Sequence, residues 1–198
     1  MIKVGITGEM GSGKSYCSKI FAELGVPVFN SDEEARRIQN TNQELKDKVI
    51  AEFGNVYLPD GRMDSVAVRK LVFGLGEEEQ ERLKKLTNIV IPYVISAFQS
   101  FCTSHSTAKY VLAESAILFE SGFNTWFDSI IYVVADDKLR IAAAILRDGI
   151  SEEEYHSRMK NQMSPVAKKM GSKYIIQNDY TSGVVEQIKA LHNKLNKC

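Results

Sequence analysis

Short apolar runs alternate with segments of helical periodicity along most of the chain. Five of the runs are rich in apolar and β-branched residues, and each predicts a strand. They are Ile2–Ile6, Val26–Phe29, Tyr110–Ala113, Ile130–Val134 and Tyr174–Gln177. Runs that are apolar at successive positions are typical of strands buried on both faces of a parallel sheet. The alternation therefore predicts an α/β fold with a five-stranded parallel sheet flanked by helices.

Apolar residues three and four positions apart predict helices between and after these strands. The helical segments are Lys14–Leu24, Glu33–Phe53 with a break at Asn40–Asn42, Val66–Phe73, Glu77–Phe101, Asp136–Leu146, a capping box at Ser151 leading to about Gln162, Pro165–Gly171 and Thr181–Lys197. Pro92 is expected to kink the long segment or to divide it in two. The helices between the second and third strands predict a large helical insertion.

A glycine-rich turn lies between the first strand and the first helix. Residues 8–15 read GEMGSGKS, which satisfies the phosphate-loop pattern G-x-x-x-x-G-K-[ST]. Glycines let main-chain N–H groups converge on phosphate oxygens, and the helix that follows adds its positive end. Lys14 then reaches the β- and γ-phosphates, and the Ser15 hydroxyl ligates a Mg²⁺ that bridges them. The expected triphosphate-binding residues are Gly8, Gly11, Ser12, Gly13, Lys14 and Ser15.

Two features of this turn leave alternatives open. A glycine-rich connection between a strand and a helix also occurs without any ligand. Glu9 places a carboxylate beside the expected polyphosphate, which is repulsive unless the side chain points away. We expect Glu9 to face solvent or a cation.

Composition limits the partners and the compartment. The chain has 25 acidic and 25 basic residues, so its net charge gives no reason to expect nucleic acid or a membrane as partner. Its three cysteines are too few and too far apart for a disulfide framework, which favours a reducing compartment. Residues 1–30 lack the pattern of a secretory signal, and no apolar run is expected to span a membrane. We expect a cytoplasmic protein.

A phosphate loop does not by itself separate kinases from switch GTPases. The base-reading tetrapeptide N-K-x-D of guanine-specific proteins does not occur in this chain. Kinases of small metabolites instead need a mobile cover with arginines that neutralise the transferring phosphoryl group. Arg140, Arg147 and Arg158 lie on two predicted helices joined by a short turn and suit such a cover. The alternative is that they are solvated charges on the surface of these helices.

The whole chain resembles the dephospho-coenzyme A kinases, which phosphorylate the ribose 3′-hydroxyl of dephospho-coenzyme A with ATP. The matching segments are GITGEMGSGKS, the acidic residue in NSDEEAR, DGRMDSVAVRKLVF, IPYV, ILFESG, RIAAAILRDG, RMKNQ and YIIQND. ILFESG, followed at the right distance by LRDG and RMKNQ, is far more specific than the phosphate loop. The resemblance implies a three-layer P-loop NTPase fold, ATP and dephospho-coenzyme A as substrates, and Mg²⁺ as cofactor.

The resemblance also implies roles for residues outside the phosphate loop. Asp32 matches the acidic residue proposed as general base, with an N-cap of the next helix as the alternative reading. Arg147 is similar to the cover arginine that contacts ATP phosphates, so it joins Asp32 and Lys14 as an expected catalytic residue. Asn178 matches the residue near the adenine.

The resemblance implies roles at three further positions. Arg69 is similar to an arginine of the insertion that holds the phosphates of the acceptor. Glu114, at the end of the third strand, is expected in the acceptor site, where it orients a Mg²⁺-bound water; the alternative is a carboxylate solvated in the loop. Tyr16, expected beside the nucleotide, replaces the usual threonine.

The chain departs from the family pattern at three other positions. Ile91 replaces a usual histidine, Ala116 a usual proline and Ala143 a usual cover arginine. Losing an arginine from the cover weakens phosphate neutralisation by about a few kcal/mol unless Arg140 or Arg158 substitutes for it.

The expected organisation is a single kinase domain with three functional parts. Residues 1–31, 106–135 and 166–198 form the nucleotide-binding core, residues 32–105 the helical acceptor-binding insertion, and residues 136–165 the lid. Besides the dephospho-coenzyme A kinase, two hypotheses remain open: a kinase of another small acceptor such as a nucleoside monophosphate, and a non-catalytic ATP-binding regulatory protein. The sequence leaves the oligomeric state open, with a monomer as one option.

Overall fold

A computed structural model describes residues 1–73, 76–160, 162–179 and 183–197. The chain forms two compact units, one of residues Met1–Asn30 and Ser100–Cys198 and the other of residues Ser31–Gln99. The first unit holds the sheet, and the second is helical. It remains a prediction that residues 32–105 bind the acceptor and that residues 136–165 form a lid.

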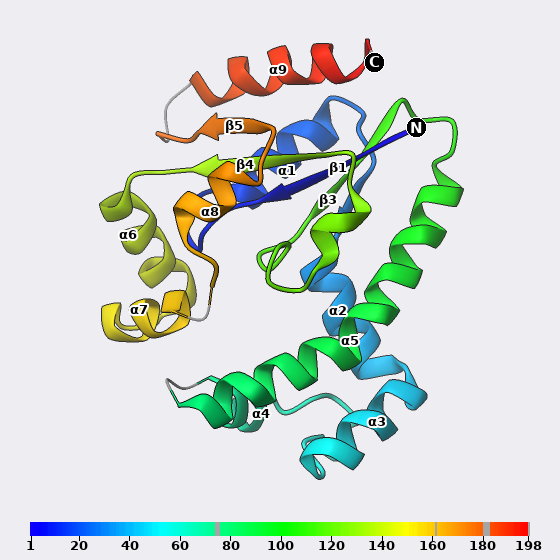
Figure 1. The fold of residues 1–198 in the computed structure, drawn as a ribbon, viewed down its shortest axis with the longest axis vertical. Coiled ribbons are helices and arrows are strands. Elements are labelled where there is room, and N and C mark those ends of the chain that lie inside the picture. The colour runs from blue at the N-terminus through cyan, green and yellow to red at the C-terminus, as the bar shows by residue number, and fades with distance from the viewer. Residues whose placement is uncertain (74–75, 161, 180–182, 198) are drawn as a thin grey trace. The chain divides into compact units, whose positions relative to one another are not determined.

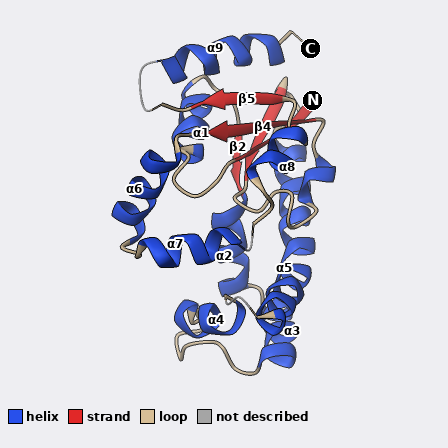
Figure 2. Ribbon diagram, turned by 60° about the vertical axis from the view of Figure 1, so that its left-hand side comes forward, coloured by secondary structure: helices blue, strands red, loops and turns tan. Residues whose placement is uncertain are grey.

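The first unit contains a parallel sheet, coloured red in Figure 2. Its strands are β1 (Ile2–Thr7), β2 (Val28–Asn30), β3 (Tyr110–Glu114), β4 (Ser129–Val134) and β5 (Tyr174–Gln177). They lie in the order β2-β3-β1-β4-β5, and every neighbouring pair is parallel. All carboxyl ends therefore meet at one edge of the sheet, which is where open α/β sheets bind ligands. The predicted five-stranded parallel α/β fold is confirmed.

Alternation along β1 explains how both faces of the sheet are buried. Val4 and Ile6 are fully buried in a core built with α1 (Lys14–Glu23) and α9 (Gly183–Leu195). Gly5 points to the other face, where a Cβ would lie 3.1 Å from Leu118 Cδ1 and 3.2 Å from Phe127 Cγ. That face also carries η1 (Phe123–Trp126) and α8 (Pro165–Met170), which lies on the opposite side of the sheet from α1 (Figure 1).

Two helices follow β4 and form a small hydrophobic cluster of their own. Asp136 caps α6 (Asp137–Asp148), and Gly149 ends it with a φ of 63°. The Ser151 hydroxyl accepts a hydrogen bond from the Glu154 N–H at 3.1 Å at the start of α7 (Glu152–Lys160). Ala144, Ile150 and Tyr155 are buried together here, with Met10, Ile141 and Met159 packed against them.

The second unit consists of helices, two of which begin at a capping side chain. They are α2 (Ser31–Thr41), α3 (Gln43–Phe53), α4 (Ser65–Val72) and most of α5 (Glu77–Ser104). Asn42 caps α3 and Asp64 caps α4, each through a side-chain oxygen that accepts main-chain N–H groups. Pro92 lies inside α5 without dividing it, so the two-helix alternative is wrong.

Several expected boundaries move by one or two residues. The second strand ends at Asn30, one residue later than expected, and α2 begins at Ser31 rather than Glu33. The seventh helix ends at Lys160. Thr181, the expected start of the last helix, and Cys198 lie outside the described residues, as does Asn161 of the RMKNQ segment.

One helix, α5, bears on the expectation that no apolar run spans a membrane, and it does not settle it. By length and composition this helix could cross a membrane, with a mean hydropathy of 1.3 over its most apolar window. One such helix is weak evidence, because core helices of other proteins meet the same criteria.

We predict that the core of β4 tolerates truncation poorly. Ile131 is fully buried in β4, whereas Ile175 on the neighbouring strand β5 is 37% exposed. Ile131→Ala should lower the free energy of unfolding in urea by about 2–5 kcal/mol, because it leaves a cavity. The matched control Ile175→Ala should cost about 1 kcal/mol or less. Equal losses in the two variants would contradict this packing.

Candidate active site

The phosphate loop, residues 8–13 between β1 and α1, has no room for side chains at its glycines. Gly11 and Gly13 both have a φ of 81°, in the left-handed region. A Cβ on Gly11 would lie 1.9 Å from the Arg140 carbonyl oxygen, and one on Gly13 would lie 2.0 Å from Asn178 Nδ2. Gly8 is equally enclosed, since its Cβ would lie 2.6 Å from the Val133 carbonyl oxygen. Glycine is therefore required at Gly11 and Gly13 by conformation and by contact together, and at Gly8 by contact.

The two polar residues that follow the loop converge on one carboxylate. Glu114, the last residue of β3, accepts hydrogen bonds from Lys14 Nζ at 2.9 Å and from Ser15 Oγ at 2.5 Å, both to Oε1. Glu114 is only 4% exposed, so the alternative of a solvated loop carboxylate is wrong. Burial by itself would raise the pKa of Glu114, but the charge of Lys14 and the bonds from Ser15 and Lys14 hold it below its ordinary value. This carboxylate is therefore ionised at neutral pH.

Asn178 fastens the loop from the end of β5. Its side chain is 1% exposed, and Nδ2 donates to the Ser12 carbonyl oxygen at 2.8 Å. Its main-chain N–H donates to the Val134 carbonyl oxygen at 2.7 Å, which ties it to the end of β4 as well. The structure thus joins Asn178 to the loop itself, while its expected contact with the adenine stays a prediction. The Ser12 hydroxyl is buried in the same turn.

The three candidate cover arginines have different surroundings. Arg147, at the end of α6, has a 61% exposed side chain and forms a two-pronged pair with Asp148, both contacts at 2.8 Å. Arg158 on α7 pairs with Glu154 at 2.5 Å. Arg140 has a side chain only 10% exposed, so for this residue the reading as a solvated surface charge is wrong.

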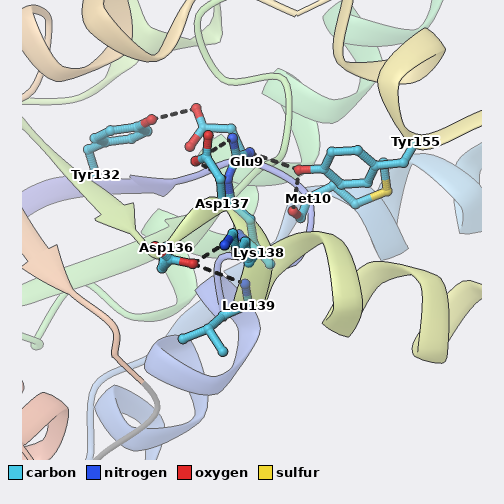
Figure 3. Close-up of polar contacts among 9 residues, drawn as sticks. Glu9, Met10, Tyr132, Asp136, Asp137, Lys138, Leu139 and Tyr155 are labelled. Carbon is cyan, nitrogen blue, oxygen red and sulfur yellow. Dashed lines mark hydrogen bonds and ion pairs between the residues drawn. The ribbon is translucent and has the colours of Figure 1, made fainter. Parts of the chain in front are cut away.

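Glu9 does not face solvent. It is 4% exposed, and the Tyr132 hydroxyl of β4 donates to its carboxylate (Figure 3). Arg140 interacts with it electrostatically. Of the two expected environments for Glu9, solvent is therefore wrong, and contact with a cation stays a prediction.

Asp32 and Arg69 belong to the helical second unit. Asp32 lies in the first turn of α2, inside the helix rather than at its N-cap. Arg69 lies in the last turn of α4. Tyr16, in the first turn of α1, is 51% exposed. The roles of these three residues stay predictions.

Comparison with known proteins decides the family. A model of the family described as dephospho-CoA kinase matches residues 2–183. The chain belongs to the dephospho-CoA kinase family. A dephospho-CoA kinase of Bacteroides fragilis is 31% identical over 96% of this chain and 91% of its own length, and one of Geobacillus kaustophilus is 34% identical over 85% and 83%.

Solved structures agree with this fold. Protein TT1252 from Thermus thermophilus superposes with a TM-score of 0.80 at 29% identity, covering 99% of this chain and 97% of its own. A dephospho-CoA kinase from Campylobacter jejuni has a TM-score of 0.69 at 20% identity, covering 98% and 97%, and supports the fold alone. The expected enzyme class, ATP-dependent phosphorylation of dephospho-coenzyme A, is confirmed by the family membership.

The ILFESG segment of this family has a structural role that residue types alone did not reveal. Glu120 accepts hydrogen bonds from the Met163 N–H and from Lys168 Nζ, each at 2.9 Å. Lys168, on α8, is fully buried. The pair fastens α8 to the loop after β3. Sequence reasoning missed Lys168 because an isolated lysine in a short amphipathic helix gives no sign of burial.

Sequence reasoning also missed the tyrosines beside the phosphate loop. Tyr132 and Tyr155 are almost fully buried, and their hydroxyls reach Glu9 and the Met10 carbonyl oxygen. Burial, then the bond to Glu9, raises the pKa of Tyr132 well above its ordinary value, so its hydroxyl keeps its proton. The available signal was the acid in the loop, Glu9, because a carboxylate that is buried needs a hydrogen-bond donor.

We predict that Gly13 and Gly25 respond differently to a methyl group. Both have a positive φ, but nothing lies within 4 Å of a Cβ on Gly25. Gly25→Ala should cost about 1–2 kcal/mol of stability from strain and leave ATP affinity unchanged. Gly13→Ala should also displace Asn178 and weaken ATP binding by about ten-fold or more, because the loop amides move. Calorimetric titration with ATP checks this; equal ATP affinity in both variants would contradict it.

Proposed function

We propose that this chain completes coenzyme A by moving the γ-phosphoryl group of ATP to the ribose 3′-hydroxyl of dephospho-coenzyme A, with the phosphate loop as the ATP site and Asp32 as the base. The observation that carries the proposal is the enclosed loop with Lys14 and Ser15 at its end, at the carboxyl edge of the sheet. The main-chain amides of such a loop suit phosphate oxygens, and Lys14 adds a mobile positive charge.

The donor set beside the loop fits Mg²⁺. Ser15 Oγ and Glu114 Oε1 are oxygen ligands of the kind that Mg²⁺ prefers, and they lie 2.5 Å apart. We expect the Ser15 hydroxyl to be a direct ligand and Glu114 to hold a water of the ion. A Mg²⁺ held there would supply positive charge that offsets the charge of the phosphates. Lys14 then exchanges its bond to Glu114 for the nucleotide.

Asp32 supplies the proton acceptor in this proposal. A carboxylate with an ordinary pKa of about 4 is too weak a base to ionise a ribose hydroxyl beforehand. It need not do so, because the transition state of phosphoryl transfer is loose and the proton can leave late. The 3′-oxygen bonds to the γ-phosphorus as the bond to ADP breaks, and the proton passes to Asp32. Support comes from the chain itself: Asp32 follows two residues after Asn30, which ends β2 in register with Glu114.

Charge neutralisation falls to Arg147 in this scheme. Its pair with Asp148 is exposed, and exposed pairs contribute only about 0–1 kcal/mol, so a phosphate can replace the carboxylate at little cost. Arg69 is proposed to hold phosphates of the acceptor. The neutral net charge supports small-molecule partners rather than nucleic acid or a membrane, and the free thiols of Cys17 and Cys102 support a cytoplasmic location. The oligomeric state stays open.

The acceptor is tested by offering equal concentrations of dephospho-coenzyme A, AMP and pantetheine phosphate with ATP and Mg²⁺ in a coupled assay for ADP. We expect kcat/KM for dephospho-coenzyme A to exceed the other two by about a hundred-fold or more, as sites that recognise several polar groups discriminate strongly. A preference for AMP would instead favour a nucleoside monophosphate kinase. Tight ATP binding without turnover on any acceptor would favour a regulatory protein.

The base is tested by Asp32→Asn. Removing a general base should lower kcat by about 10²- to 10⁴-fold while ATP affinity stays the same. Glu33→Gln is the matched control, because it removes an equal charge from the same turn of α2 and its side chain is exposed. Unchanged kcat in Asp32→Asn would remove this residue from the mechanism.

A further inference from the structure

The phosphate loop carries an acid whose charge opposes that of a bound nucleotide. Glu9 is 4% exposed, so water does little to screen its carboxylate. The hydrogen bond from Tyr132 satisfies an oxygen of Glu9 but brings no positive charge (Figure 3). The loop therefore needs a cation nearby if it is to hold a polyphosphate.

Arg140 is a buried cation beside this part of the loop, because the Tyr155 hydroxyl to which it donates also donates to the carbonyl oxygen of Met10, the residue after Glu9. It extends from α6, is 8% exposed as a whole residue, and interacts electrostatically with Glu9. Its guanidinium donates to the Tyr155 hydroxyl at 2.8 Å and to Asp137 Oδ1 at 3.0 and 3.1 Å. Burial by itself would lower the pKa of Arg140, but the bond to Asp137 and the negative groups around it, Glu9 among them, raise it above its ordinary value. Arg140 thus keeps its charge beside Glu9.

The same arginine also helps to fix the shape of the loop. The Tyr155 hydroxyl accepts from Arg140 and lies 3.3 Å from the Met10 carbonyl oxygen, to which it donates (Figure 3). The main chain of Arg140 itself closes against Gly11. The charge that compensates Glu9 is therefore built into the helix that packs against the loop.

We propose that Arg140 is a positioning residue for ATP, which makes the loop receptive to polyphosphate by neutralising Glu9. The inference rests on ATP binding at the phosphate loop, as proposed above. Arg140 does not replace the missing cover arginine at Ala143, because its donors are directed to Asp137 and Tyr155 rather than kept for a substrate. Its effect on ATP exists only because Glu9 is charged.

The test is a double-mutant cycle with Arg140→Gln, Glu9→Gln and the variant that carries both. Arg140→Gln alone should raise the Kd for ATP by about ten-fold or more, because a partly buried carboxylate then faces the phosphates uncompensated. Glu9→Gln alone should bind ATP as well as the wild type or more tightly. The double variant should return to within about three-fold of the wild type, since the cycle isolates the interaction between the two side chains.

Further measurements distinguish an electrostatic effect of Arg140→Gln on ATP binding from a loss of structure. The increase in Kd caused by Arg140→Gln should be larger for ATP than for ADP and should shrink at high salt, since both effects follow the charge of the ligand. Thermal unfolding reports the structural cost of each variant separately. Arg140→Lys, which keeps the charge but not the forked donor, should restore most of the ATP affinity. Lys138→Gln is the matched control, because it removes the same charge from an exposed position on α6 and should leave the Kd unchanged.

Each contrary outcome has a definite meaning. If Glu9→Gln weakens ATP binding ten-fold, or if the double variant is as weak as Arg140→Gln, the proposed neutralisation is wrong. If Arg140→Gln reduces the affinity for ATP and ADP equally at all salt concentrations, the role of Arg140 is structural. If instead the wild type binds no ATP, or binds it as well after Lys14→Ala, the phosphate loop is not the ATP site and the proposed function fails first.

Discussion

The site depends on close packing of one loop backbone against three neighbours. The carbonyl oxygen of Val133 in β4, the carbonyl oxygen of Arg140 in α6 and the amide of Asn178 after β5 approach glycines of the phosphate loop so closely that a single Cβ would overlap them. A main chain held on several sides keeps its amides in one arrangement before any ligand arrives. Preorganised donors of this kind bind anions without the cost of ordering them.

Two acid–base pairs balance the charge around that backbone. Lys14 pairs with Glu114 at the end of β3, and Arg140 pairs with Asp137 on α6, where we propose that it also offsets the charge of Glu9. Burying an unpaired charge costs several kcal/mol, so each of these residues stabilises the fold only together with its partner. The basic residues of the two pairs have different proposed roles. In the proposed mechanism Lys14 exchanges Glu114 for a phosphate, whereas Arg140 is held in place by its hydrogen bonds to Tyr155 and Asp137.

The sequence was informative where a residue type has one strong physical reason to be at a position. The glycines of the loop, the strands that are apolar on both faces, and the capping box at Ser151 all follow from local rules, and the structure contains each of them. The first strand, the first helix and the last strand were placed within one residue. Pro92 shows where such rules fail, because a proline disfavours a helix interior but tertiary packing can override it.

The sequence could not predict which side chains meet across the sheet. The run Ile130–Val134 predicts a strand, but nothing in it says that the hydroxyl of Tyr132 meets an acid 123 residues earlier in the chain. Likewise, the alternation of charges in α6 does not tell Arg140, which is buried, from Arg147, which is exposed. Both facts depend on the distance between β4 and the phosphate loop and on the rotation of α6 about its axis, which only the folded chain fixes.

The surroundings of the arginines also bear on the missing cover residue at Ala143. Arg140 and Arg158 were the candidates to replace it, and both are engaged with acids of their own helices, Asp137 and Glu154. The pair on Arg158 is partly exposed and therefore weak, whereas Arg140 also donates a buried hydrogen bond to the Tyr155 hydroxyl, which would be costly to break. Substitution by Arg140 would uncover Glu9 at the moment when the phosphates need a positive loop. These contacts suit the proposed role of Arg140 beneath the loop better than a place in the cover, and Arg147 stays the arginine that we propose to meet the transferring group.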